Sequence, residues 1–325
     1  MIYRNISGTD LNTSAICMGT GVLSVENDAD YCFSLLDRFI EGGGNFVDTA
    51  NVYGKGLPQK RNVSELNIGE WMKKRGNRYN VIIGTKGGHP NLAAMHISRL
   101  SREEVASDLE ESLRALQTDY IDLYWLHRDD EKLPVEYILD YMNGFVKEGK
   151  IRYFGCSNWK AGRIQEAEEL AKCNSVQGFS GNQMMWSLAV PNKDAIPDKT
   201  MVCMDEDTMR LHIKTGITAI PYSSQANGFF SKLLQQGATL MNEGVKKLYY
   251  NEKNLKRFEK IVKLEQELAK PVTEIILGYL ISHPFTTIPI VGPHTIEQMD
   301  DSMKAGDFVP DERIIRFLEE DYLPV

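Results

Sequence analysis

Short apolar runs alternate with amphipathic stretches along the chain. Runs rich in branched and aromatic residues predict eight buried strands at residues 16–18, 45–47, 81–83, 120–126, 151–155, 179–185, 217–221 and 287–291. Ahead of them, residues 3–6 and 11–15 flank the turn-forming segment Ser7-Gly8-Thr9-Asp10 and predict a β-hairpin.

Helical periodicity fills the intervals between these runs. It is typical of residues 27–41, 101–117, 134–148, 160–172, 205–215, 254–269 and 272–282. In the second of these stretches Val105, Leu109 and Leu116 share one face, and Ser101 with Glu104 forms a capping box at its start.

Strands that alternate with helices indicate parallel pairing through right-handed crossovers. The pattern therefore predicts a (β/α)8 TIM barrel with an N-terminal β-hairpin, and an open doubly wound sheet is the alternative. No linker-like or repeated segment interrupts the pattern, so we expect a single domain over residues 1–325. Excursions from the barrel are expected at residues 53–62 and 189–205, which carry Gly, Pro and mixed charges without helical periodicity.

Four polar side chains follow consecutive predicted strands. Asp48 ends the run at 45–47, Tyr53 lies shortly after it, Lys86 follows the run at 81–83, and His127 follows the run at 120–126. Because the carboxyl ends of barrel strands lie side by side, we expect these four side chains to converge.

The four residue types suit the delivery of a proton to a carbonyl oxygen. A free phenol has a pKa of about 10 and is a weak acid at neutral pH. A neighbouring ammonium favours the phenolate and makes the phenol a better acid. Lys86 would supply that ammonium, Asp48 would hold it charged and in place, and His127 would donate a hydrogen bond to the substrate oxygen.

Composition excludes several classes of function. The net charge is −8, and no basic run occurs, so nucleic acid and anionic membrane surfaces are not expected partners. The first residues lack the apolar core of a signal peptide, and no apolar stretch reaches the ~18 residues of a transmembrane helix. The 5 cysteines are scattered and form no CxxC pair. We therefore expect a cytoplasmic protein with reduced thiols.

The order of short motifs resembles that of the aldo-keto reductase superfamily over nearly the whole chain. The segments that carry the resemblance are Gly43-Gly-Asn-Phe-Val-Asp48-Thr-Ala with Tyr53-Gly, Gly84-Thr-Lys86, Leu123-Tyr-Trp-Leu-His127, Gly155-Cys-Ser157-Asn158, Asn182-Gln183 with Trp186-Ser, Pro221-Tyr-Ser223, and Pro289-Ile-Val-Gly292 with Glu297-Gln298. The resemblance implies reduction of an aldehyde or ketone to an alcohol, or the reverse, with hydride from NADPH or NADH. It also implies that Tyr53 is the general acid, that Lys86 and Asp48 tune it, and that His127 orients the carbonyl.

The resemblance further implies a nucleotide site at the barrel mouth. Ser157, Asn158 and Gln183 would bind the nicotinamide carboxamide, because amide groups both donate and accept hydrogen bonds. Trp186 would stack on the nicotinamide ring, at a position where the family usually has Tyr. The other expected contacts are Gly19, Thr20 and Asp48 at the first strands, where small residues admit a ligand, and Tyr222, Ser223, Gln225 and Gly228 in the loop that would cover the pyrophosphate.

The adenosine end of this site departs from the family. Gly292 precedes a helix with a capping box from Thr295 to Gln298, and a helix N-terminus suits a phosphate. His294 stands where the family usually has Arg, and Ser302 where it usually has Asn. The missing cation weakens the case for NADPH, but we still expect NADPH rather than NADH.

Two other functions fit parts of the pattern. His127, Asp129 and Asp130 are possible ligands of a metal-dependent hydrolase, but no second imidazole is expected near His127, so no metal site is predicted. A nucleotide-binding regulatory or scaffold subunit with the same fold is the other alternative. Charged loops after the strands favour a polar small-molecule substrate such as a sugar or a keto-acid, and no oligomeric state is predicted.

Overall fold

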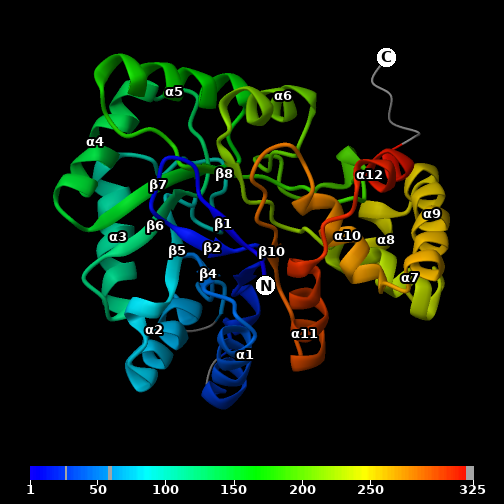
Figure 1. The fold of residues 1–325 in the computed structure, drawn as a ribbon. Helices are drawn as coiled ribbons and strands as arrows, with labels where there is room; N and C mark the ends of the chain where they lie inside the picture. Colours follow the sequence, from blue (N-terminus) through cyan, green and yellow to red (C-terminus); the bar gives the residue numbers. More distant parts are fainter. Residues whose placement is uncertain (26–27, 58–60, 320–325) are drawn as a thin grey trace.

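The computed structural model describes residues 1–25, 28–57 and 61–319, and these form a sheet of eight parallel strands (Figure 1). The order around the sheet is β10-β3-β4-β5-β6-β7-β8-β9. Hydrogen bonds from Ala219 N to Thr286 O and from Ile288 N to Ala219 O, both 2.9 Å, join its two edges. The predicted (β/α)8 barrel is confirmed, and the open sheet is wrong. The strands are β3 (Cys17–Gly19), β4 (Phe46–Asp48), β5 (Ile82–Gly87), β6 (Ile121–Leu126), β7 (Ile151–Ser157), β8 (Gly181–Gln183), β9 (Thr218–Ala219) and β10 (Ile290–Val291).

The predicted hairpin is also confirmed, and it closes the amino end of the barrel. Strands β1 (Tyr3–Asn5) and β2 (Asn12–Ser14) pair antiparallel. Ile6 and Leu11 of the hairpin are buried against the barrel-interior residues Phe46 and Trp125. The hairpin therefore forms an apolar plug at the end of the barrel opposite to the strand ends that carry Asp48 and Lys86.

Helices surround the barrel. Those expected from the sequence are α1 (Ala29–Glu41), α3 (Arg102–Leu116), α4 (Val135–Lys147), α5 (Ala161–Asn174), α6 (Glu206–Thr215), α9 (Glu252–Leu268), α10 (Val272–Ile281) and α11 (Ile296–Lys304). Asp28 caps α1 by accepting a hydrogen bond from Tyr31 N at 3.1 Å, and Asn27, the expected first residue, lies outside the described residues. The capping box of α3 is present, because Ser101 Oγ accepts from Glu104 N at 3.3 Å.

The sequence pattern did not predict four helices, α2 (Val63–Arg75), α7 (Phe229–Gln236), α8 (Glu243–Tyr249) and α12 (Glu312–Glu319). Helix α2 buries Ser64, Glu65 and Gly69, so its buried face shows no apolar periodicity in the sequence. A Cβ at Gly69 would lie 2.2 Å from Ala115 O of α3, which shows how closely the two helices pack. The polar buried face therefore reflects close packing and internal hydrogen bonds rather than exposure.

Helices α7, α8, α9, α10 and α12 lie together at one side of the barrel, and we call them the side lobe (Figure 1). They pack around a second apolar cluster that includes Phe229, Tyr249 and Ile261. Most of the side lobe is an insertion between β9 and β10 that the sequence pattern did not identify as an excursion. The expected excursion at 189–205 contains only a short 3-10 turn (Lys193–Ala195), and residues 58–60 of the other lie outside the described residues.

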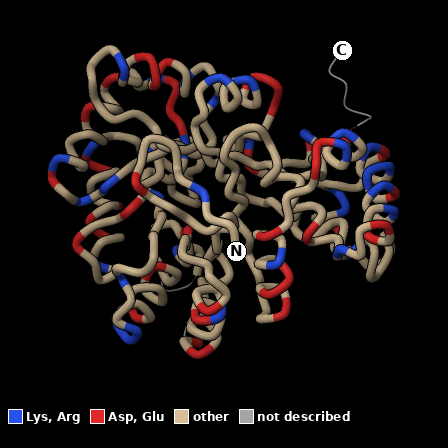
Figure 2. The backbone as a smooth tube through the Cα atoms, viewed as in Figure 1, with Lys and Arg blue, Asp and Glu red and all other residues tan. Residues whose placement is uncertain are grey.

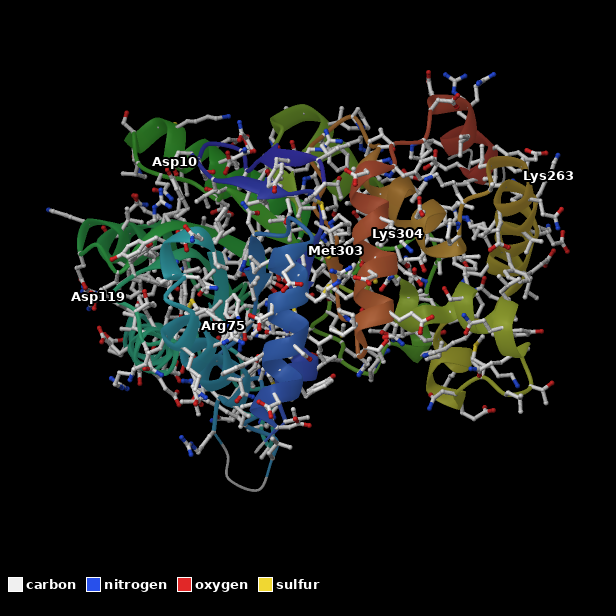
Figure 3. The ribbon with its side chains drawn as sticks, turned by 60° about the horizontal axis from the view of Figure 1, so that its bottom comes forward. Asp10, Arg75, Asp119, Lys263, Met303 and Lys304 are labelled. Atoms are coloured by element: carbon white, nitrogen blue, oxygen red, sulfur yellow. The ribbon has the colours of Figure 1, made fainter. Side chains whose placement is uncertain are left out.

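Helices α1 and α11 lie side by side in both views of the ribbon (Figures 1 and 3). Arg38 Nε of α1 donates to Asp300 Oδ1 of α11 at 2.6 Å. Gly42, which follows α1, leaves room for Met303 of α11, because a Cβ there would lie 2.0 Å from Met303 Cε. This contact holds α11 against α1, just after β10, which pairs with β3. The nucleotide end of the site is expected there.

Charges of both signs are interspersed along the outer helices (Figure 2). Many of them form pairs one helical turn apart, as Lys256 does with Glu252 at 3.0 Å on α9. Within the described residues, no helix is both long and apolar enough to cross a bilayer.

Candidate active site

A cavity of about 860 Å³ opens at the carboxyl ends of the barrel strands. All but one of the expected site residues line it. These are Gly19, Thr20, Asp48, Tyr53, Lys86, His127, Ser157, Asn158, Gln183, Tyr222, Ser223, Gln225, Gly228, Gly292, His294, Gln298 and Ser302. The exception is Trp186, which lines a separate cavity.

Lys86 and Asp48 form a buried ion pair at the base of the cavity. Their side chains are 3% and 2% exposed, and the Lys86 ammonium donates to Asp48 Oδ2 and, at 2.6 Å, to Thr49 O. Burial lowers the pKa of Lys86, but its negative surroundings, chiefly the carboxylate of Asp48, leave the pKa raised. Burial raises the pKa of Asp48 against the opposing effects of Lys86 and Gln183. The pair therefore keeps a positive charge fixed beneath the cavity.

Tyr53 lies directly above this charge. Lys86 Nζ is 5.2 Å from the centroid of the Tyr53 ring, and the ring of His127 is 6.2 Å away at an angle of 77°. Gly54 follows with a φ of 102°, a conformation that only glycine adopts without strain. This turn presents the phenol to the cavity between the ammonium and the imidazole.

His127 continues the ladder of β6, since its N–H donates to Gly87 O at 2.9 Å. Burial lowers the pKa of His127 well below its ordinary value, and His89, Arg128 and Lys86 add repulsion of a positive charge. Its Nδ1 is buried and has no partner among the described residues. The imidazole is therefore neutral, and no acceptor holds its proton on Nδ1.

A second imidazole stands beside His127, contrary to the sequence-based expectation. The rings of His89 and His127 are 4.7 Å apart between centroids, at an angle of 65°. His89 follows β5 and also lines the cavity. The sequence contains a signal for it, because His89 comes three positions after Lys86 at the end of the same strand.

Amide and hydroxyl groups at the ends of β7, β8 and β9 line another part of the cavity. Gln183 Nε2 donates to Asp48 Oδ1 at 2.9 Å, while its Oε1 is buried without a partner among the described residues. The Oδ1 of Asn158 accepts from Tyr222 Oη at 2.6 Å and from Val202 N at 3.0 Å. The Nδ2 of Asn158 donates to Ser157 Oγ at 3.0 Å. Gln183 and Ser157 thus keep hydrogen-bonding capacity toward the cavity, whereas Asn158 is engaged within the protein.

Trp186 is not brought to this part of the cavity. It stacks on His283 with ring centroids 4.6 Å apart, and it also meets Tyr279 edge-on in the side lobe. Trp186 comes three residues after the end of β8, and its backbone N–H still donates to Tyr222 O at 3.3 Å, but its side chain lines the other cavity. Tyr222, which follows β9, presents the aromatic ring that lines the cavity.

The part of the cavity where the sequence predicts the nucleotide phosphate lies at the start of α11. Thr295 caps this helix by accepting from Gln298 N at 3.2 Å, as the capping box predicted, and Gln298 Oε1 accepts from His294 N at 2.8 Å. Gln225 Nε2 donates to Ser302 Oγ at 3.2 Å and so ties the loop after β9 to α11. Two charged residues that the sequence analysis missed, Lys232 and Asp301, also line this end.

Gly19 and Gly21 at the first strand both line the cavity. A Cβ at Gly19 would lie 2.6 Å from Ile290 Cγ2, so the missing side chain also lets the neighbouring strand β10 pack closely. A Cβ at Gly21 would meet nothing within 4 Å. Gly21 therefore leaves open space at this part of the cavity.

Among residues 1–25, 28–57 and 61–319, no three His, Cys, Asp or Glu side chains gather in a way that could hold a metal ion. Asp129, one of the ligands considered for a metal site, instead accepts from Arg163 Nη2 at 3.0 Å.

Comparison with known proteins agrees with this geometry. The model of the Aldo/keto reductase family matches residues 15–320. The chain is 30% identical to the uncharacterized oxidoreductase YrpG of Bacillus subtilis, over 98% of this chain and 95% of that protein. It is 28% identical to a norsolorinic acid reductase of Aspergillus flavus, over 97% and 79% of the two chains. It is 27% identical to the aryl-alcohol dehydrogenase NADP(+) of Phanerodontia chrysosporium, over 90% and 76%. The resemblance seen in the motifs is confirmed: the chain belongs to the aldo/keto reductase family and is an oxidoreductase of carbonyl compounds.

Proposed function

We propose that the protein reduces an aldehyde or ketone to an alcohol with NADPH, and that Tyr53 donates the proton. The observation that carries the proposal is the meeting of Tyr53, Lys86, Asp48 and His127 in one cavity at the carboxyl ends of the strands. NADPH, when bound, would supply the hydride that adds to the carbonyl carbon. The residues of the chain hold the nucleotide and the substrate and deliver the proton.

The part of the cavity at Gln183 and Ser157 fits a nicotinamide carboxamide. Gln183 Oε1 is a buried acceptor without a partner among the described residues, and Ser157 Oγ–H lies nearby as a donor. A carboxamide offers an NH₂ donor and a carbonyl acceptor, so it complements both groups. We assign the carboxamide to Gln183 and Ser157. Asn158 would act through Tyr222, whose ring it holds, and Tyr222 would provide the stacking face first expected of Trp186.

The proton step follows from the fixed charge below Tyr53. As hydride reaches the carbonyl carbon, negative charge develops on the oxygen, and the Tyr53 O–H transfers its proton there. The phenolate that remains is stabilised by the Lys86 ammonium, which Asp48 keeps charged and oriented. A neutral His127 can carry its proton on Nε2 and donate a hydrogen bond to the same oxygen.

Lys232 supports the choice of NADPH over NADH. Three Lys or Arg side chains among the described residues line the cavity. Lys86 is paired with Asp48, and Arg128 is paired with Asp198 at 2.8 Å. Within the described part of the chain, Lys232 Nζ donates only to the backbone oxygen of Asn227, at 2.8 Å. This cation is available to a phosphate group and would offset the loss of the family's Arg at His294.

The decisive experiment measures NADPH consumption at 340 nm with 4-nitrobenzaldehyde as a reactive carbonyl. We expect turnover by the wild type, and we expect Tyr53→Phe to bind NADPH with the same affinity but to lose turnover. Tight NADPH binding without consumption, with this aldehyde and with alcohols plus NADP⁺, would favour the regulatory or scaffold alternative.

The proposal includes a cytoplasmic location and a polar small-molecule substrate, a sugar or a keto-acid. The 5 cysteines, which are all free, support the location. The polar lining of the cavity supports the substrate class, because Tyr53, His89, His127 and Arg128 all border the same space.

A further inference from the structure

We propose that His89 selects carbonyl substrates with a hydroxyl group on the adjacent carbon, by accepting a hydrogen bond from that hydroxyl at its Nε2. The substrates would be α-hydroxy aldehydes or α-hydroxy ketones. This inference rests on the proposed carbonyl reduction, and it assigns a role to a residue that proton transfer does not require.

His89 lies where the substituents of a bound carbonyl would be. It lines the cavity, and its ring contacts that of His127 edge-on at 4.7 Å between centroids. Tyr53 and His127 would bind the carbonyl oxygen, so the carbon chain of the substrate must extend past one of their neighbours. His89 is the polar neighbour on the β5 side.

The backbone around His89 is held rigidly. Gly88 N donates to Asp108 Oδ2 at 2.9 Å, and Arg99 Nη1 donates to His89 O at 3.1 Å. Arg99 and Asp108 are themselves paired at 2.8 Å. Gly88 has a φ of 72°, and a Cβ there would lie 2.6 Å from Leu100 Cδ2. This support fixes the position of the imidazole, as a group that recognises one substrate position requires.

The hydrogen bond at the other ring nitrogen sets the tautomer. His89 Nδ1 lies 2.7 Å from Pro90 O, and a carbonyl oxygen only accepts, so Nδ1 carries the proton. Burial and the charge of Arg128 lower the pKa of His89, so the ring is neutral. Its Nε2 is therefore an acceptor. Within the described residues no donor reaches it, and it remains available to a ligand.

An acceptor at this place favours a hydroxyl over a carboxylate. Two cations among the described residues lie near it, and both are already paired. Arg99 is paired with Asp108 at 2.8 Å. Arg128 donates through Nε, Nη1 and Nη2 to Thr200 Oγ1, His127 O and Asp198 Oδ2, each at 2.8 Å. A substrate carboxylate would find a neutral acceptor and an arginine already neutralised by Asp198. Of the two substrate classes suggested by the charged loops, the hydroxylated one fits and the keto-acid does not.

The test compares 2-hydroxypropanal with propanal, which differ only by the hydroxyl group, with NADPH as the reductant. We expect wild-type kcat/KM to favour 2-hydroxypropanal. His89→Phe keeps a ring against His127 but removes the acceptor, and it should lower the ratio of the two kcat/KM values by about fivefold to tenfold, the typical effect of one lost hydrogen bond. His89→Gln, which restores an acceptor oxygen, should recover part of the ratio.

Matched controls separate recognition from folding and from the reaction itself. Hydration of each aldehyde in water is the same for every variant, so the change in the ratio reports on the protein. Met201→Leu, another cavity-lining change, should alter both substrates by the same factor. His89→Leu replaces His89→Phe if the latter does not fold, as judged by its affinity for NADPH.

The outcomes are distinct for the two proposals. If both aldehydes are reduced and His89→Phe changes them equally, the role of His89 is refuted while carbonyl reduction stands. The same holds if the wild type reduces 4-nitrobenzaldehyde or propanal but shows no preference for the hydroxylated substrate. Absence of NADPH consumption with all three carbonyl compounds would refute both proposals.

Discussion

The two ends of the barrel are built from the same strands but have opposite chemistry. On β4, Phe46 contacts the apolar plug, whereas Asp48, two residues later, forms the ion pair beneath the cavity. The chain through β6 changes in the same way, from Trp125 in the interior to His127 at the mouth. Residues two apart on a strand point to the same side, so each strand passes from apolar to ionisable within the barrel interior. The amino end provides stability, and the carboxyl end holds groups that are costly to bury but useful for catalysis.

Removal of the phenol should have the largest effect on the carboxyl end. Tyr53→Phe deletes the proposed proton donor, and kcat should fall by about a thousandfold, within the range for a general acid. Tyr222→Phe is the matched control, because it removes a hydroxyl from the same cavity, one that donates to Asn158. The control should lose less than about tenfold. Fluorescence titration with NADPH should give the wild-type affinity for Tyr53→Phe, and a Tyr53→Phe enzyme with normal kcat would disprove the role of Tyr53.

Removal of the cation should damage both activity and stability. Lys86→Met leaves Asp48 buried without its partner, so the free energy of unfolding should fall by about 3 kcal/mol and turnover should be lost. The double variant Asp48→Asn with Lys86→Met removes the unpaired charge as well. It should regain most of the stability in urea unfolding but none of the activity. Recovery of activity in the double variant would mean that the ion pair serves only the fold.

The amino end should respond in the opposite way. Leu11 is 3% exposed in the plug, and Leu11→Ala should lower the free energy of unfolding by about 2–4 kcal/mol. The kcat of the folded enzyme should not change, because the plug does not reach the cavity. Leu240, which is 73% exposed, gives a matched control in Leu240→Ala, with an expected change below about 0.5 kcal/mol. If Leu11→Ala lowered kcat under conditions where the protein is fully folded, the two ends of the barrel would not be functionally separate.

Much of the barrel could be predicted because its strands are buried on both sides and its helices bury one apolar face. Helix α2, which the sequence did not predict, lacks a regular apolar face. Helix α2 turns Ser64 and Glu65 inward, and Glu65 Oε1 accepts from Thr85 Oγ1 at 2.6 Å, so a tertiary hydrogen bond replaces apolar periodicity. The side lobe is packed by contacts between segments distant in the sequence, which local periodicity cannot reveal.

The site could be predicted where a residue follows directly from a strand end, and not where the path of the loop decides. Asp48 and Lys86 lie within their strands, so the barrel alone places them. Trp186 was assigned to the cavity by its motif, but the chain after β8 carries it to a stack on His283. Lys232 was missed because its place depends on the left-handed residues 226–228 before α7, which turn that helix toward the cavity.

A substitution at the proposed nucleotide end of the cavity should have an effect of moderate size. His294→Arg restores the cation that the family usually has, next to Gln298 at the start of α11. It should tighten NADPH about tenfold, or about 1.4 kcal/mol, through a charge-assisted contact with the additional phosphate. The affinity for NADH, measured by the same fluorescence titration, should stay the same. Equal tightening of both nucleotides would place His294 at the diphosphate instead.

The smallest expected effect concerns the titration of His127. Its pKa in the folded protein is well below the ordinary value of about 6.5, because burial and the charges of Arg128 and Lys86 disfavour the imidazolium. His127 should therefore stay neutral between pH 8 and 5.5. A plot of kcat/KM against pH over this range should show no midpoint near pH 6.5. Stability should nevertheless decline as pH falls below about 6.5, since the unfolded chain binds the proton first and the folded chain does not. His127→Gln should remove part of that decline in urea unfolding at pH 7.5 and 5.5. A midpoint near pH 6.5 in the wild-type rate profile that disappears in His127→Gln would contradict this prediction. It would show that the imidazole takes up a proton at the cavity, although burial and positive charge at the carboxyl end of the barrel should prevent protonation.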